Sequence, residues 1–98
     1  MFDVLYCGDT SAKAAAAYLL GVLTKGGFSY QYLNSDEKFI NAKNAPAKLL
    51  ILSDYSAKNI SENQRKKIFE WVKGGMSFWM IGGWVSFCGL NGEYKKDW

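Results

Sequence analysis

The sequence predicts an α/β protein in which four parallel strands form one sheet with helices on its faces. Three observations support this fold class. Apolar strand segments alternate with helical segments along the 98 residues, glycine pairs follow both main helices, and a capping box opens the second of them. Because such alternation favours parallel strands joined by right-handed crossovers, we expect a single domain over residues 1–98.

The first half of the chain predicts two strands with a helix between them. Residues 2–7 form an apolar run that only Asp3 interrupts, as in a buried parallel strand. Residues 12–25 have helical apolar spacing, and a glycine pair ends that helix. Alternating aromatic residues at 28, 30 and 32 predict a second strand, and the polar segment after it allows a short helix over residues 36–43.

The second half repeats this alternation. The run Leu-Leu-Ile-Leu within residues 48–53 predicts a buried strand, and residues 76–81 predict a fourth strand before a glycine-rich tail. Between them, Ser61 and Gln64 have the spacing of a capping box, so we expect a helix over residues 61–73. The apolar face expected for this helix consists of Ile68, Phe69 and Val72.

The composition excludes several classes of function. The chain has no His and therefore no Ser-His or Cys-His catalytic pair, and its two Cys cannot complete a four-ligand zinc site. We expect no metal and no cofactor. The net charge of +3 comes from cations that are nearly all Lys, whereas base recognition favours Arg, so we expect no nucleic-acid partner.

The uncharged segments and the Cys content of the sequence predict a reduced, cytoplasmic protein. The uncharged segment 74–92 has the length of a membrane span, but six glycines divide it into short pieces, so we expect no membrane association. No basic and apolar leader opens the chain, and the two Cys show no spacing pattern typical of disulfide frameworks. The residues do not identify a small-molecule ligand.

Parallel α/β sheets bind ligands outside the carboxyl ends of their strands, which directs attention to the segments after each strand. The first of these segments consists of Gly8, Asp9, Thr10 and Ser11. Because it precedes a predicted helix, it is either an anion or nucleotide site on free N–H groups or a simple N-cap turn. It lacks the Lys of a phosphate-binding loop.

Two further segments carry reactive side chains. Asp54 and Tyr55 follow the third strand, where a carboxylate is typical of the acceptor in receiver-like regulators. Such regulators also place two acids after the first strand, and this chain has only Asp9, so a capping or loop-tethering role is the alternative. Cys7 and Cys88 have no neighbouring cation or helix start that would activate a thiol, and we expect ordinary reduced Cys at both positions.

Three segments together resemble one protein family. They are residues 4–11 (VLYCGDTS), 49–55 (LLILSDY) and 80–89 (MIGGWVSFCG). They resemble the cytoplasmic glutamine amidotransferase-like proteins, which are related to class I glutamine amidotransferases and share a flavodoxin-like core. The resemblance implies a three-layer, flavodoxin-like (Rossmann-like) α/β fold, truncated to four parallel strands in the order 2-1-3-4. The resemblance spans all four predicted strands and implies that the chain corresponds to the N-terminal half of that family's domain.

The resemblance also implies what the chain lacks. Gly82, Gly83 and Trp84 match the glycine loop whose N–H groups form an oxyanion hole in class I enzymes. The family has Glu where this chain has Val85 and His where it has Cys88, and the position of its nucleophilic Cys would follow residue 98. We therefore expect an amidotransferase-like protein that is not catalytically competent by itself.

The predicted strand order leaves part of the sheet uncovered. The helix over residues 12–25 covers one face near the first two strands, so the same face of the other two lacks a helix. The fourth strand presents to this side either Met76, Phe78 and Met80 or Trp79 and Ile81. We expect a homodimer, or a partner chain, on this bare face; the alternative is that residues 84–98 fold back over it.

Overall fold

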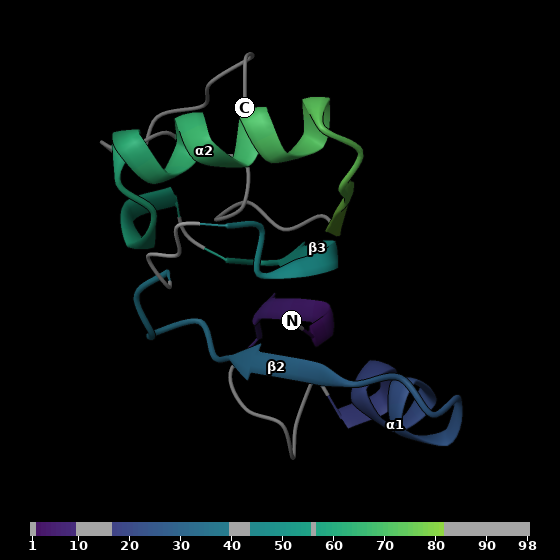
Figure 1. Ribbon diagram of the computed structural model, residues 1–98. Helices are drawn as coiled ribbons and strands as arrows, with labels where there is room; N and C mark the ends of the chain where they lie inside the picture. The colour runs from purple at the N-terminus through teal and green to yellow at the C-terminus, as the bar shows by residue number, and fades with distance from the viewer. Residues whose placement is uncertain (1, 10–16, 40–43, 56, 82–98) are drawn as a thin grey trace.

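Four parallel strands form one sheet in the order β2-β1-β3-β4 in the computed structural model, which confirms the predicted fold class (Figure 1). The structure describes residues 2–9, 17–39, 44–55 and 57–81. The elements in chain order are β1 (Phe2–Gly8), α1 (Ala17–Lys25), β2 (Tyr30–Leu33), β3 (Ala47–Ser53), the 3-10 turn η1 (Ala57–Asn59), α2 (Glu62–Lys73) and β4 (Ser77–Ile81). Each strand begins and ends within two residues of its prediction.

The side chains of the two central strands, β1 and β3, alternate between two apolar layers. On one face, Leu5, Leu50 and Leu52 are fully buried and pack in a cluster with α2. On the other, Tyr6 and Ile51 pack with α1 through its buried leucines. Because both faces of these strands are covered, β3 has a continuous apolar run rather than an alternating one. Figure 1 shows α2 beside β3 and α1 at the β2 end of the sheet.

The capping box of α2 forms as the sequence predicts. The Ser61 hydroxyl accepts a hydrogen bond from the Gln64 N–H at 3.1 Å, and the Gln64 side chain accepts one from the Ser61 N–H at 2.9 Å. Ile68, Phe69 and Val72 share one face as expected and line a hollow with Phe78, but only Ile68 is buried, whereas 55% of Phe69 and 41% of Val72 is exposed. Within the described residues, no strand lies beyond β4 to cover these two side chains.

The segment after β2 also differs from its prediction. Residues 36–39 form a turn and no helix, and the other residues of the expected 36–43 helix, 40–43, lie outside the described ones. The reason is local hydrogen bonding: the Asn34 side chain accepts from the Asp36 N–H at 2.8 Å, and the Asn34 carbonyl accepts from the Glu37 N–H at 3.1 Å. Asn side chains that bond nearby backbone in this way compete with helix formation. Residues 10–16, expected to be turn and helix, are likewise outside the described residues.

Alternation along β4 decides which of its side chains meet which layer. Three apolar residues belong to the cluster on the α2 side: Met76, Phe78 and Met80. Ile81 packs instead against the cluster on the α1 side, and Trp79 shares its face by the two-residue period of a strand. Trp79 is 49% exposed. Of the two sets that the sequence left open, Trp79 and Ile81 therefore face the side where α1 lies.

Candidate functional site

The carboxyl ends of three neighbouring strands meet in one row. Gly8 of β1 lies opposite Ser53 of β3, and Ser53 lies opposite Ile81 of β4. Past the strand ends, the Asp9 N–H donates to the Ser53 carbonyl at 2.9 Å, and the Asp54 N–H donates to the Ile81 carbonyl at 3.4 Å. We call these five residues the carboxyl edge. It is the side of a parallel sheet on which ligands bind.

The backbones of β1 and β3 approach most closely at Gly8. A Cβ atom built on this glycine would lie 1.8 Å from the Ser53 carbonyl oxygen, and Gly8 has a φ of +129° that other residues rarely adopt. Only glycine therefore fits this position, for both steric and conformational reasons. The close approach fixes the spacing between the segments that carry Asp9 and Asp54.

Asp9 and Asp54 share an uncommon backbone conformation. Their φ angles are 59° and 50°, and they are the only non-glycine residues of the described part with positive φ. Left-handed non-glycine residues carry conformational strain and are frequent at ligand sites, and Asp tolerates this region better than most residues. Here both occur directly after adjacent strands, so each reverses the chain at the same edge.

The Asp9 carboxylate is held by a buried phenol. Tyr6 lies on β1 and is 2% exposed, and its hydroxyl donates a hydrogen bond to Asp9 Oδ2. Burial and the Asp9 carboxylate together raise the pKa of the Tyr6 phenol to about 12, so Tyr6 remains a neutral donor at physiological pH. The Tyr32 hydroxyl adds a longer bond of 3.5 Å to the Asp9 carbonyl. Asp9 is thus fixed in both its side chain and its backbone.

The loop after β2 is tied to the same edge. The Ser35 N–H donates to the Asp9 carbonyl at 2.8 Å, and the Asn59 side-chain amide donates to the Ser35 carbonyl at 2.7 Å. Tyr55 is fully buried, and its hydroxyl donates to the Glu37 carbonyl. Burial raises the pKa of this phenol as well. Tyr55 therefore acts as a buried tether that holds the loop, and its ring belongs to the core.

The one thiol that the structure describes is unsuited to nucleophilic chemistry. Cys7 is fully buried between the sheet and α2. Burial is the main reason that its pKa is raised well above the ordinary value, and the Glu37 carboxylate adds to the shift. A reactive Cys needs the opposite, a lowered pKa and access to substrate. Cys7 is a core residue, as expected for an ordinary reduced thiol.

Several predicted site residues come together at the carboxyl edge. Gly8, Asp9 and Asp54 lie there side by side, although the sequence places Asp54 more than forty positions after the other two. The predicted positions outside the described residues are Thr10, Ser11, Gly82, Gly83, Trp84 and Cys88. The residue before that glycine pair, Ile81, accepts the Asp54 N–H, so the chain leaves β4 next to Asp54.

Sequence reasoning missed Tyr6 and Tyr32. A signal was present for the first of them, because Tyr6 is the only hydroxyl-bearing residue in the apolar run of residues 2–7. A buried Tyr hydroxyl needs a hydrogen-bond partner, and the polar group next along the chain is Asp9. No comparable signal linked Tyr32 to Asp9, since that contact depends on the pairing of β1 with β2.

The carboxyl edge offers two carboxylates and the Ser53 hydroxyl, with the Tyr6 and Tyr32 hydroxyls bonded to Asp9 beside it. Within the described residues, no group of three or more His, Cys, Asp or Glu side chains could hold a metal ion. The Asp9 N–H already donates to Ser53, which removes one of the donors that an anion site on the Gly8–Ser11 turn would use. The edge can therefore orient a polar ligand.

Comparisons with known proteins add no family assignment. No protein-family model and no curated protein matches the chain. Among the described residues, no helix combines the length and the apolar character needed to cross a membrane.

Proposed function

We propose that the chain forms the N-terminal part of a glutamine amidotransferase-like α/β domain and does not hydrolyse glutamine by itself. The observation that carries this proposal is the carboxyl edge, where two left-handed aspartates flank the Gly8–Ser53 contact. An edge with fixed, strained polar residues is typical of a ligand site. In this proposal the chain supplies the wall of a site and other protein supplies the nucleophile.

The strand order supports the comparison with a flavodoxin-like core. The order β2-β1-β3-β4 is the first part of the 2-1-3-4-5 order of doubly wound sheets of that type. The segment that resembles the oxyanion-hole loop follows Ile81 in the sequence, and the Ile81 carbonyl accepts a hydrogen bond from the Asp54 N–H at the carboxyl edge.

The expected lack of glutamine hydrolysis follows from the nucleophiles and general bases that the chain contains. The chain contains no His to act as a general base, and Cys7 is buried with a raised pKa. Cys88 stands where the related family has His, and a Cys at that position has no His in the chain to activate it.

The test is ammonia release from glutamine by the purified chain, with an authentic glutaminase as the positive control for the assay. We expect no release above a buffer blank. The matched variants Cys7→Ser and Cys88→Ser, measured beside the wild-type chain, separate intrinsic activity from a contaminant. Release that one of these variants abolishes would contradict the proposal.

A receiver-like role is the second candidate, and the exposure of Asp54 favours it. Asp54 follows β3, the acceptor position of receiver domains, and its side chain is exposed. Asp9, which would help to bind the required cation, is instead engaged by Tyr6. Incubation with acetyl phosphate, followed by intact-mass measurement, tests this role. A labile phosphate adduct that Asp54→Ala removes would favour the receiver over the amidotransferase-like half domain.

A further inference from the structure

The helix α1 is apolar on the side that faces away from the sheet as well as on the side that packs against it. Leu20 and Leu23 are buried against the sheet. Only Lys25 among the nine residues of α1 is charged, whereas six of the twelve residues of α2 are charged. A surface helix normally carries charged residues on its outward side, and a helix that is apolar all round is normally covered on all sides. The composition of α1 is therefore that of a helix with a partner on its outer side.

Four residues at helical spacing form this outer side: Tyr18, Gly21, Val22 and Lys25. We call them the α1 face. Together with Gly26 they line one shallow hollow. Tyr18 is 86% exposed and Val22 is 54% exposed, and a Cβ atom on Gly21 would meet no atom within 4 Å. The α1 face thus offers an exposed aromatic ring and an exposed aliphatic side chain beside open space.

The α1 face is complementary to itself when two copies of the helix run antiparallel. A two-fold axis that crosses the helix between Gly21 and Val22 leaves Tyr18 and Lys25 at equal distances on either side. Tyr18 of one copy then lies opposite Lys25 of the second, which allows a cation–π contact at each end of the face. The two Val22 side chains meet at the axis. Gly21 has no side chain to hold the helices apart, so they can approach closely.

We propose that a second copy of this chain packs on the α1 face in this antiparallel arrangement. A parallel arrangement would bring the two Lys25 ammonium groups together, whereas the antiparallel one separates these residues by about 10 Å along the helix axis. The interface is isologous, with one patch used twice, as in most homodimers. This inference depends on α1 alone and is independent of any role of the carboxyl edge.

The exposed area indicates a weak dimer. An aromatic side chain carries roughly 150–250 Å², so Tyr18 and Val22 together expose on the order of 200 Å² of side-chain surface per copy. Neighbouring residues add to this area, but the total stays below the roughly 800 Å² per partner of a standard interface. We therefore expect a dissociation constant in the micromolar range and dissociation on dilution.

A charge reversal tests the register of this pairing. Tyr18→Lys places a second cation opposite Lys25 of the other copy and should raise the dissociation constant by at least about tenfold. Adding Lys25→Glu to Tyr18→Lys places opposite charges across the same two contacts, so the dissociation constant of the double variant should fall back at least about threefold from that of Tyr18→Lys. Salt should weaken the double variant's dimer more than the wild-type dimer, because only the former depends on ion pairs.

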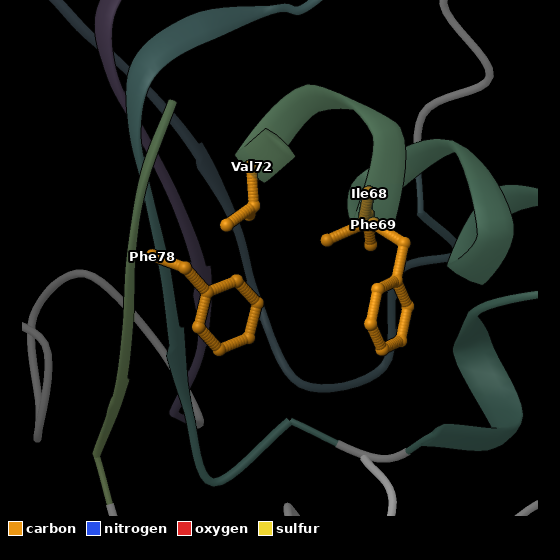
Figure 2. Close-up of a pocket in the computed structure, with 4 residues that line it drawn as sticks. All are labelled: Ile68, Phe69, Val72 and Phe78. Atoms are coloured by element: carbon orange, nitrogen blue, oxygen red, sulfur yellow. The ribbon is translucent and has the colours of Figure 1, made fainter. Parts of the chain in front are cut away.

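Light scattering after size exclusion, run on the full chain over a range of micromolar concentrations, measures these dissociation constants. Phe69→Lys is the matched control, because it introduces the same charge at an exposed aromatic residue of another helix. Phe69 lies on α2 and is 55% exposed, and it lines the separate hollow that Figure 2 shows between α2 and β4. This variant should dimerise as the wild type does. Circular dichroism of each variant establishes that it remains folded.

Three results would overturn the proposal. The first is a folded wild-type chain that stays monomeric at every concentration, which would leave the α1 face to a different protein. The second is a dimer that Phe69→Lys weakens as much as Tyr18→Lys does, because the interface would then lie on α2 or involve both helices. The third is a double variant that dimerises no better than Tyr18→Lys alone, which would exclude the antiparallel register of Tyr18 with Lys25.

Discussion

The carboxyl edge and the β4 side of the sheet differ in how completely their groups are partnered. At the carboxyl edge, the backbone of Asp9 bonds Ser53 and Ser35, and its carboxylate accepts a buried phenol hydroxyl. On the β4 side, the large apolar side chains of Trp79, Phe69 and Val72 are about half exposed. The first region is polar and fixed, and the second is apolar and exposed.

This difference separates two uses of the same sheet. Fixed polar groups keep a defined geometry, which is what recognition of a small ligand needs. An exposed apolar surface has no such geometry to offer a small polar ligand, but it gains free energy when another protein surface covers it. The comparison therefore predicts that substitutions at the carboxyl edge lower folding stability more than those on the β4 side do.

The largest expected effect is that of Gly8→Ala. The new Cβ would clash with the Ser53 carbonyl oxygen 1.8 Å away, and the φ of +129° is strained for Ala. We expect the free energy of unfolding in urea to fall by about 4 kcal/mol or more. Gly21→Ala is the control, because its Cβ would meet no atom within 4 Å and helix propensity should raise stability by up to about 1 kcal/mol. Equal effects of the two substitutions would show that the close approach at Gly8 is unimportant.

Two substitutions to Ala compare how much the buried centre of the sheet and its β4 side contribute to the free energy of unfolding. Leu50→Ala removes a fully buried side chain of β3 from the cluster with α2 and should lower the free energy of unfolding by about 3 kcal/mol. Val72→Ala removes a side chain that is 41% exposed and should lower it by no more than about 1 kcal/mol. Urea denaturation at a concentration where the chain is monomeric measures both. If Val72→Ala were as destabilising as Leu50→Ala, the β4 side would be a covered part of the core.

A smaller effect concerns the Tyr6–Asp9 hydrogen bond. Tyr6→Phe removes the donor to Asp9 and should lower the free energy of unfolding by about 1–2 kcal/mol at pH 7. Tyr18→Phe, in which the lost hydroxyl belongs to an exposed ring, should leave it unchanged and serves as the control. A Tyr6→Phe protein as stable as the wild type would show that this bond does not hold the edge.

The same bond predicts how stability depends on alkaline pH. The pKa of Tyr6 is raised to about 12 in the folded chain, against about 10 in the unfolded chain, so the folded state holds this proton more tightly. Its contribution to stability is complete below pH 10 and is lost as the pH rises from 10 to 12. Tyr6→Phe should make this decline shallower, with the remainder due to Tyr55, Tyr32 and Cys7, whose pKa values are also raised. An unchanged slope would contradict the assignment to Tyr6.

Much of the fold could be predicted because its signals are local. The apolar run of β3, the capping box at Ser61 and the glycine pair after α2 depend on neighbouring residues alone. Asp9 and Asp54 were predicted as edge residues for the same reason, since any residue after a parallel strand lies at that edge. The strand order was expected from the resemblance to a flavodoxin-like core, because the handedness of crossovers sets the face that each helix covers and not the order of the strands.

The remaining features depend on contacts across the sheet. The sequence could not show that Tyr32 reaches the Asp9 carbonyl, or that Phe69 lies beyond the last strand and stays exposed. The absence of a helix over residues 36–39 reflects an Asn34 side chain that bonds the backbone, an interaction that helix spacing does not reveal.

The comparison of the two regions is tested most directly by urea denaturation of Gly8→Ala and Trp79→Glu side by side. Gly8→Ala places a Cβ atom 1.8 Å from the Ser53 carbonyl oxygen and should lower the free energy of unfolding by about 4 kcal/mol or more. Trp79→Glu changes a side chain that is 49% exposed and should lower it by less than half as much. Equal losses of stability in the two variants would contradict the distinction between a fixed carboxyl edge and an exposed β4 side.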